Sequence, residues 1–417
     1  MKKNILLFLS LTTLLFQSCD NDNNDDDYAD YLVARPLIMS KAEFANSVDI
    51  VAPRPIDESG KIYTYKDYIF VNDKYQGLHV IDNRNPSQPV KIAFINIPGN
   101  VDISVKNDYL FADSLMDLVV IDISDINNLE VVNRLENVLY NNVFWPFEAD
   151  IVEGSSYDYE NEILVGWETT TERRLISEVE GRNGGDIFFN DMALAENASG
   201  DTGQGGSLAR FKIVEDYLYA VDSHYINVFD ISELDDPKDL EDVYAGFDIE
   251  TIFNQGNYLF LGSMRGMYIY DITVPATPTL VSEFEHGTAC DPVVVDGNYA
   301  YVTLRGGNWC GATESGLFIV DISNIESPEL AVSYPMDGPY GLGIKDEKLF
   351  VCDGDSGLKV YDKTDINDLK ELNHFEDIVT FDVIPMENNL IMVGDGVLYQ
   401  YEYLESGIKL LSQIGLN

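Results

Sequence analysis

The stretch "LVVIDISDINNLEVV", residues 118–132, contains the pattern that decides the fold. Four apolar residues precede Asp122, a polar turn sequence follows it, and a second apolar run begins at Leu129. A continuous apolar run indicates a strand that is covered on both faces, whereas a half-exposed strand would alternate polar and apolar residues. Aspartate and serine after the run favour a tight turn, because their side chains bond to the backbone nearby.

The same pattern recurs along the chain, with most copies spaced 39 to 41 residues apart. Six copies end their apolar run on an aspartate, namely Asp82, Asp122, Asp230, Asp271, Asp321 and Asp362. In a seventh, degenerate copy, "VLYQYEYLESGIKLL", Tyr401 stands at the aspartate position. We interpret these aspartates as turn formers and not as catalytic residues.

Each unit also contains a polar hairpin turn upstream of the apolar run, as in "VKNDYLFADS" and "NQGNYLFLGS". With the strand after the turn, such as "PVKIAFI" at residues 89–95, this gives four short strands per unit. A period of about 40 residues with four strands is typical of a propeller blade. The sequence therefore predicts an all-β fold, a β-propeller of about seven four-stranded blades.

The copies at 118–123, 226–231 and 317–322 resemble the LVIVD repeat of β-propeller proteins from bacterial and archaeal surfaces. The resemblance extends roughly over residues 57–404, apart from one insertion, and is weakest in the last copy. It implies a propeller fold and a location in the cell envelope. It implies no established activity.

The N-terminal segment "MKKNILLFLSLTTLLFQSC" has two lysines, an apolar stretch and a small residue directly before Cys19. The apolar stretch is shorter than the roughly 20 residues of a membrane span, and the order of regions is that of a secretory signal. Residues 1–18 resemble a bacterial lipoprotein signal peptide, which makes Cys19 the predicted lipidation site. An ordinary signal peptide is the alternative.

Residues 19–30 are predicted to be the lipidated cysteine and an acidic tether, since "DNDNNDDD" is too polar to bury. Such tracts resemble the surface-export signals of one group of Gram-negative lipoproteins. We therefore expect an outer-membrane lipoprotein exposed at the cell surface, and a periplasm-facing one is the alternative. Residues 31–56 are predicted to form a strap across the propeller, with a strand added to the last blade as the alternative, and residues 57–417 to form the propeller.

The formal net charge of −46 argues against nucleic acid and anionic membrane surfaces as partners, because the protein's field repels phosphates. Contact with the membrane is therefore expected through the lipid alone. The sequence predicts no cofactor and no metal.

An insertion at about residues 141–207 interrupts the repeat. It is either a decorated blade edge or a flap over one face of the propeller, and Trp145, Phe147 and Trp167 would be the anchors of a flap. Its last part, "ENASGDTGQGGS", has the composition of a loop.

Cys290 and Cys310 flank a predicted hairpin and come out at the same end of one blade. In an oxidising compartment, a disulfide between them is expected. A metal site that adds His286 is the alternative, although a paired CxxC is lacking. Cys352 falls inside an apolar strand and is predicted to be a buried free thiol.

Two sets of side chains are candidates for binding. The first enters the innermost strands and should ring the mouth of the central channel: Asp102, Arg210, Glu250, Asp291, Gly341 and Asp382. This ring is either a solvated, partly self-neutralised channel or a site for a cation or polar ligand. The second set lies on the loops of the fifth unit: His286, Arg305 and Trp309.

No histidine of the chain stands in a recognisable catalytic motif. The predicted function is a binding or scaffolding module at the cell surface for an extracellular protein or glycan. The alternative is an enzyme, for example a glycan hydrolase, with its site at the channel mouth. An exposed pair of carboxyl groups in a deep pocket would favour the enzyme, whereas a shallow face with aromatic side chains would favour binding.

Overall fold

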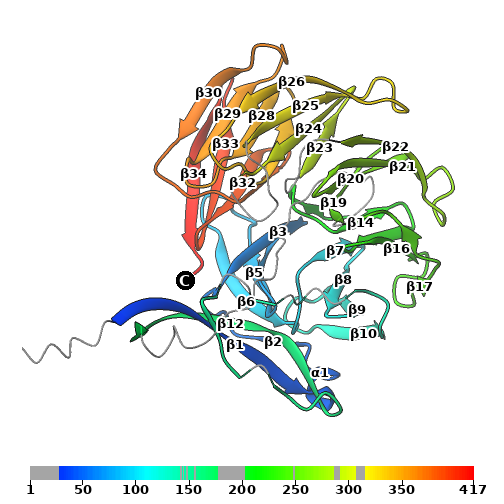
Figure 1. Ribbon diagram of the computed structural model, residues 1–417, viewed down its shortest axis with the longest axis vertical. Coiled ribbons are helices and arrows are strands. Elements are labelled where there is room, and N and C mark those ends of the chain that lie inside the picture. Colours follow the sequence, from blue (N-terminus) through cyan, green and yellow to red (C-terminus); the bar gives the residue numbers. More distant parts are fainter. Residues whose placement is uncertain are drawn as a thin grey trace, which may run out of the picture.

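The repeat unit folds as an antiparallel sheet whose strands follow one another along the chain (Figure 1). The computed structural model describes residues 28–417 except 141–142, 144, 147–148, 155, 177–201, 248, 286–291 and 307–314. Seven sheets built in this way lie within the described residues, and we number them in chain order.

The first four sheets are formed as follows. Sheet 1 contains β3 (Ser59–Tyr65), β4 (Tyr68–Asp73), β5 (Gly77–Asp82) and β6 (Val90–Asn96). Sheet 2 contains β7 (Ile103–Lys106), β8 (Tyr109–Ser114), β9 (Asp117–Asp122) and β10 (Glu130–Leu135). Sheet 3 contains β14 (Phe211–Val214), β15 (Tyr217–Val221), β16 (Tyr225–Asp230), β17 (Lys238–Asp239) and β18 (Val243–Tyr244). Sheet 4 contains β19 (Ile249–Gln255), β20 (Tyr258–Ser263), β21 (Gly266–Asp271) and β22 (Thr279–Glu285).

The last three sheets have the same order. Sheet 5 contains β23 (Val293–Asp296), β24 (Tyr299–Leu304), β25 (Gly316–Asp321) and β26 (Glu329–Pro335). Sheet 6 contains β27 (Leu342–Lys345), β28 (Lys348–Cys352), β29 (Leu358–Asp362) and β30 (Lys370–Phe375). Sheet 7 contains β31 (Asp382–Pro385), β32 (Asn389–Gly394), β33 (Val397–Tyr403) and β34 (Ile408–Gly415).

The sheets are arranged as a closed ring (Figure 1). The first strand of each sheet contacts the first strand of the next, and β31 contacts β3, so the last sheet meets the first. Hydrophobic clusters fill the spaces between neighbouring sheets, and the cluster between sheets 7 and 1 includes Ile62, Ile384 and Leu416. The prediction of an all-β propeller is therefore confirmed.

The third strand of each sheet carries the apolar run that defines the repeat. In β5 and β9 the five residues before the aspartate are all buried, as expected for strands covered on both faces. The neighbouring fourth strand shifts register by one residue at the same place in six of the seven sheets, which is a β-bulge. A bulge bends its strand and increases the local twist, so the outer edge of each of these sheets is irregular.

The repeat aspartates form turns, as predicted. All six accept a hydrogen bond from the backbone N–H two residues further on; the bonds from Ser124, Ser232 and Ser323, for example, measure 2.8, 2.9 and 2.8 Å. This side-chain-to-backbone bond fixes the turn into the fourth strand.

The placement of Tyr401 at the aspartate position was wrong by one residue. Strand pairing puts Glu402 opposite Asn389, as Asp321 lies opposite Tyr299, and Tyr401 is a buried strand residue. Glutamate has one more methylene group than aspartate, and Glu402 forms an ion pair with Lys409 at 2.7 Å.

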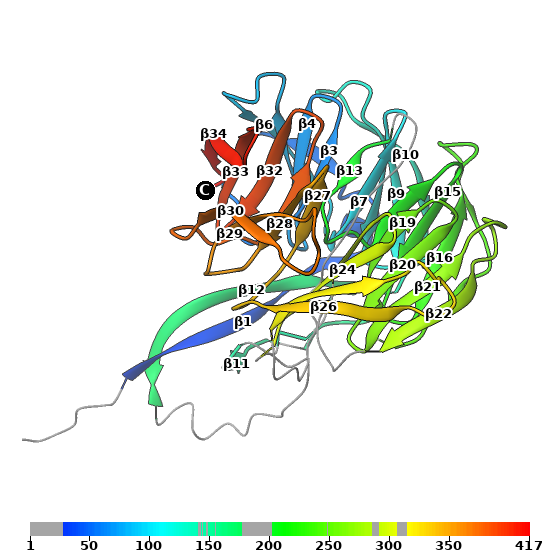
Figure 2. The same ribbon diagram turned by 90° about the horizontal axis from the view of Figure 1, so that it is seen from above.

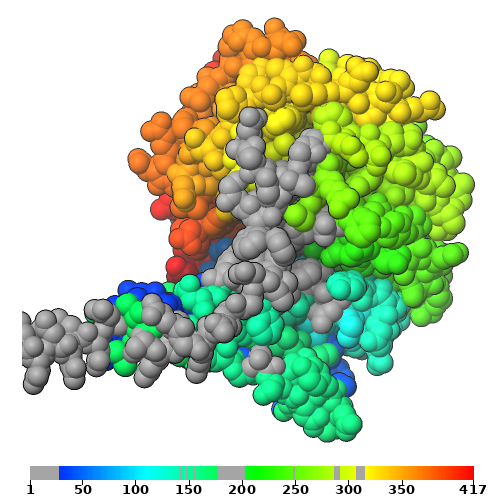
Figure 3. Space-filling model, in the orientation of Figure 1, coloured from blue at the N-terminus to red at the C-terminus, as the bar shows by residue number. Residues whose placement is uncertain are grey.

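Residues ahead of the propeller pair with the insertion. Strand β1 (Tyr28–Ser40) runs antiparallel to β12 (Glu162–Leu175) over its whole length, and β11 (Ile151–Val152) adds to it briefly. One end of this ribbon packs on loops of sheets 1 and 2, where Gly166 approaches Tyr75 and Val165 clusters with Leu115. The end at Tyr28 projects from the propeller (Figures 2 and 3).

The segment after the ribbon leads into sheet 1. It forms one helical turn, α1 (Lys41–Phe44), with Ser40 and Glu43 as a capping box, and then β2 (Asp49–Val51) on the outer edge of β6. Sheet 7 supplies its own fourth strand, β34. Within the described residues, no helix has the length and apolarity that crossing a membrane requires.

Candidate functional site

The channel and one face of the ring carry the residues that the sequence singles out. Successive strands of a sheet run in opposite directions, so the chain changes face at every strand. The connection between the second and third strands therefore lies on the same face of the ring as the link from the fourth strand to the next sheet. We call this side the loop face. The predicted mouth residues lie where the first strands begin, at the loop-face end of the channel.

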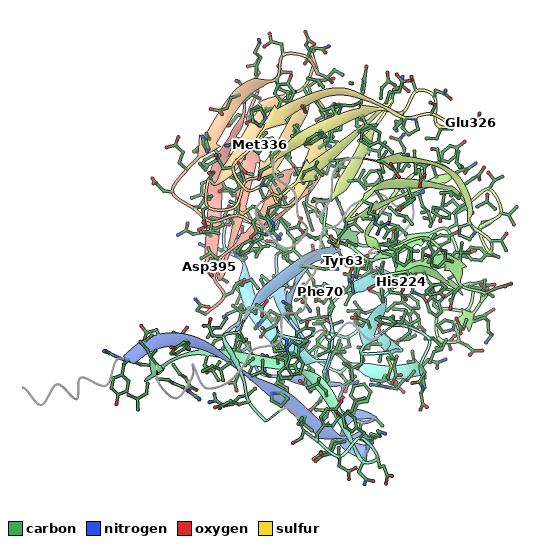
Figure 4. All side chains as sticks on the ribbon, viewed as in Figure 1. Tyr63, Phe70, His224, Glu326, Met336 and Asp395 are labelled. Carbon is green, nitrogen blue, oxygen red and sulfur yellow. The ribbon has the colours of Figure 1, made fainter. Side chains whose placement is uncertain are left out.

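A segment of the chain itself lies at the centre of the ring. Residues 202–207, which we call the plug, run along the first strands and include β13 (Gln204–Gly205), which pairs with Tyr63 and Thr64 of β3. Tyr63 lies toward the middle of the ring (Figure 4). At one end of the plug the N–H of Gly203 donates to Val105 of sheet 2, and at the other end Ser207 contacts sheets 6 and 7.

The composition of the plug explains its fit. A Cβ atom on Gly203 would lie 2.2 Å from the ring of Tyr63, and one on Gly206 would lie 2.3 Å from Asp382. Only glycine leaves room for the backbone at these two positions. The sequence predicted a loop for this Gly-rich stretch, but its last residues are extended, because first strands on either side offer backbone partners.

Four of the predicted mouth residues lie near one another and are buried. Asp102, Arg210, Glu250 and Asp382 are at most 4% exposed. Asp102 accepts a hydrogen bond from Lys61 at 3.0 Å and bonds from the backbone of Arg210 and Phe211. Burial lowers the pKa of Lys61 and the pKa of Arg210, and nearby carboxylates oppose both shifts.

Asp382 occupies a different environment from Asp102. Its Oδ1 accepts from the N–H groups of Ser207 at 3.1 Å and Val383 at 2.9 Å, whereas Oδ2 has no hydrogen-bond partner within the described part of the chain. Burial raises the pKa of Asp382 to about 8. The carboxyl group is therefore mostly protonated near neutral pH.

The mouth is thus a buried polar network, closed by the plug and neutralised in part by Lys61 and Arg210. Gly341 approaches Asp382, since a Cβ atom on Gly341 would lie 2.6 Å from its Oδ1. Asp291 lies outside the described residues. No open pair of acidic side chains is found among the described mouth residues, and a cation or polar-ligand site there stays a prediction.

A second kind of buried aspartate was missed by the sequence reasoning. Asp73, Asp113 and Asp353 lie at the end of the second strand of their sheets or within one residue of it, and each accepts backbone N–H bonds from two residues of the segment that enters the same sheet. Asp73 also contacts His79 at 3.3 Å, and Lys359 bonds to Asp353. Burial raises the pKa of Asp113 to about 6. The signal was present in "FADS" and "VCDG", where a charged residue follows an apolar strand.

The predicted loop-face residues are only partly described. Arg305 stacks over the ring of Tyr340 at 4.0 Å, and Tyr340 packs edge-on against Phe381. His286 and Trp309 lie outside the described residues. So do Cys290 and Cys310, and the disulfide between them stays a prediction.

The remaining predicted residues have mixed outcomes. Cys352 is a free, fully buried thiol, as predicted, and burial raises its pKa well above the usual value. Trp145 is 41% exposed and packs edge-on against Trp167 at 5.2 Å. Phe147 and Cys19 lie outside the described residues.

An exposed group of aromatic residues lies on the loop face between sheets 3 and 4. We call it the aromatic patch, and it consists of His224, Tyr225, Tyr244 and Phe247. Tyr225, Tyr244 and Phe247 are 42%, 52% and 50% exposed. Neighbouring rings pack edge-on. The ring centroids are 5.7 Å apart for Tyr225 and Tyr244, 6.2 Å apart for Tyr244 and Phe247, and 5.4 Å apart for Phe247 and His224. Figure 4 shows His224 away from the channel, on the sheet 3 side of the ring.

The backbone explains why these rings are exposed. The outer edge of sheet 3 is formed by the short strands β17 and β18, and Tyr244 in β18 pairs directly with Tyr225. The chain then turns at Gly246, whose φ of 134° favours glycine. This turn brings Phe247 beside His224.

Comparison with known families identifies the repeat. The model described as the LVIVD repeat matches residues 58–94, 99–135, 205–239, 250–285 and 286–335. The chain is an LVIVD-repeat protein. The matched regions correspond to sheets 1 to 5, and sheets 6 and 7 have the same strand order.

Solved structures similar to this LVIVD-repeat protein include Hsv2 of Kluyveromyces lactis, with a TM-score of 0.49, 10% identity, and coverage of 86% of this chain and 100% of that one. BamB from Moraxella catarrhalis has a TM-score of 0.46 and 11% identity, covering 81% of this chain and 82% of its own. Sqt1 of Saccharomyces cerevisiae has a TM-score of 0.47 and 9% identity, covering 88% of this chain and 87% of its own. A search of curated proteins found no match.

The LVIVD repeats account for the turn aspartates and the apolar third strands, but not for the aromatic patch. His224 and Tyr225 directly precede the apolar run "INVF" of the third unit, and Tyr244 and Phe247 belong to "EDVYAGFD", which lies between the matched regions. A dense group of aromatic residues in a link between two sheets was the available signal.

Proposed function

We propose that this protein is a lipoprotein of the outer cell surface and that it binds an extracellular protein through the aromatic patch on its loop face. The propeller supplies a rigid frame on which loops present side chains to a partner. The anchor, the location and the partner together define the proposed role.

The exposure of the aromatic patch carries the proposal. Three large rings, each about half exposed, lie in contact on one face. Contiguous exposed apolar groups usually mark an interaction site, and tyrosine, tryptophan and arginine dominate binding energy at protein interfaces. Arg265 adds a guanidinium group at 5.5 Å from the ring of Phe247.

The N-terminal sequence supports the anchor. A signal segment ends at Cys19, an acidic tract follows, and the described chain begins with β1 at Tyr28. A single lipidated residue followed by a polar tether would leave the propeller free to meet partners outside the membrane.

The anchor is tested by Cys19→Ser. We expect this variant to leave the membrane fraction, because the acidic domain has no other affinity for lipid. Persistent membrane association would contradict the lipoprotein assignment. Protease added to intact cells should degrade the wild-type propeller, and complete protection would place it inside the envelope.

The binding role is tested by capture from intact envelopes. The wild-type protein should retain a partner that the double variant Tyr244→Ala, Phe247→Ala loses. Tyr159→Ala is the matched control, since Tyr159 is 69% exposed but lies outside the patch. Equal capture by all three proteins would refute the role of the patch. A partner that survives protease treatment of the envelopes would be a glycan and would overturn the proposal of a protein partner.

A further inference from the structure

We propose that the aromatic patch binds an arginine-rich segment of its protein partner. This inference rests on the proposed binding role and specifies the chemistry of the partner. It comes from the surroundings of the patch, which combine exposed ring faces with carboxylates.

The first observation is that a guanidinium group already lies over one of the rings. Arg265 lies over Phe247 at 5.5 Å from the ring centroid. Aromatic faces attract cations, and arginine is the usual partner because its planar group stacks on the ring. The rings of Tyr225 and Tyr244 lie in the same series, and no cation–π contact to them occurs within the described residues.

The second observation is the row of carboxylates along the sheet 4 side of the patch. Glu283 pairs across the strands with Tyr268, and Glu285 pairs with Gly266, so both side chains lie on the face of the sheet that carries Tyr268. Tyr268 in turn lies against the turn of the patch, because a Cβ atom on Gly246 would be 3.3 Å from its ring. Glu283 and Glu285 are exposed.

The third observation is the charge on the sheet 3 side. Glu241 and Asp242 directly precede β18, which carries Tyr244, and both are exposed. Four exposed carboxylates therefore lie in the segments that flank the patch, and one exposed guanidinium, that of Arg265, lies among them. Charge complementarity favours a cationic partner, and the net charge of −46 attracts such a partner over longer distances.

Arginine fits this arrangement better than lysine does. A guanidinium group can stack on Tyr225 or Tyr244 while its N–H groups bond to a carboxylate, whereas an ammonium group is a strongly hydrated point charge. A segment with several arginines could satisfy the rings and the carboxylates together.

The test uses the full chain purified in detergent and three labelled peptides, hexa-arginine, hexa-lysine and hexa-glutamate, with binding measured by fluorescence anisotropy in near-physiological salt. Hexa-arginine should bind most tightly. The double variant Tyr244→Ala, Phe247→Ala should bind it about tenfold more weakly, which corresponds to about 1.4 kcal/mol.

Charge variants separate the patch from the general charge of the protein. The pair Glu283→Gln, Glu285→Gln should weaken hexa-arginine binding several-fold. The matched pair Glu326→Gln, Glu329→Gln removes the same charge elsewhere and should leave binding unchanged. Glu326 lies in the turn after β25 (Figure 4), and Glu329 begins β26. Arg265→Ala should tighten binding, because it exposes the ring of Phe247 and removes a like charge.

Equal losses in the two glutamine pairs, or no preference for hexa-arginine over hexa-lysine, would overturn the proposal. Unchanged binding by the Tyr244→Ala, Phe247→Ala variant would do the same. If the double variant loses the envelope partner but the wild-type protein shows no preference for hexa-arginine, the binding role stands and the arginine-rich partner is wrong.

Discussion

Replacing Asp382 by asparagine should make the protein less sensitive to pH. Asp382 is fully buried beside the plug, where Oδ1 accepts backbone bonds from Ser207 and Val383. An asparagine has the same shape and can accept these bonds with its own Oδ1. It differs in that it cannot ionise.

The magnitude follows from the pKa of the carboxyl group. Burial raises the pKa of Asp382 to about 8 in the folded state, whereas an unfolded aspartate has a pKa of about 3.9. The folded state binds this proton more tightly, so the stabilisation is complete below about pH 4 and is lost as the pH rises through about 8. Between these limits the loss is about 1.4 kcal/mol per pH unit, or about 3 kcal/mol from pH 5 to pH 7.5.

The assay is urea unfolding, followed by tryptophan fluorescence, of the wild-type protein and Asp382→Asn at pH 5 and pH 7.5. The wild type should lose about 3 kcal/mol more than the variant over this interval. The other titrating groups, including Asp113, are present in both proteins and cancel in the comparison. If the difference in stability between the two proteins is the same at both pH values, Asp382 is ionised throughout and the argument from its burial is wrong.

Three further outcomes are expected. Gly206→Ala should destabilise the fold by about 1–3 kcal/mol, because its Cβ would overlap Asp382. Gly338→Ala is the control and should not destabilise the fold, since no atom lies within 4 Å of the new Cβ. Equal melting temperatures of the two variants would show that the plug tolerates the methyl group. Mass spectrometry of the unreduced protein should find a Cys290–Cys310 cross-linked peptide, and free alkylation of both thiols would disprove the bond. Asp321→Ala should cost about 1 kcal/mol in urea unfolding through loss of its turn bond, and no change would show that the turn forms without it.

The fold could be predicted because each unit repeats a strong local signal. An apolar run that ends in aspartate marks a strand covered on both faces and the turn after it, and both are visible in a single copy. The seventh copy was misaligned by one residue because it lacks the aspartate that marks the end of the apolar run in the other six. Register became clear only from pairing, which places Glu402 opposite Asn389.

The candidate site was harder to predict because it depends on contacts between distant segments. Counting along the repeat located Asp102 and Asp382 where the innermost strands begin. It could not reveal that Ser207, which belongs to the insertion and not to a repeat unit, would cover Asp382 and exclude solvent. The aromatic patch was missed for a related reason, since exposure of Tyr244 and Phe247 depends on the short outer strands of sheet 3.

The plug also constrains the order in which the chain can fold. Residues 202–207 precede sheets 3 to 7 in the sequence, yet they bond to Leu342 of sheet 6 and to Asp382 and Pro385 of sheet 7. Sheets 1 and 2 can form early from adjacent strands, but the plug cannot bond to its final partners until sheets 6 and 7 have formed. Ring closure and plug insertion must therefore be completed together, late in folding. A chain exported across a membrane from its N-terminus would remain open at its centre until its C-terminal strands had crossed.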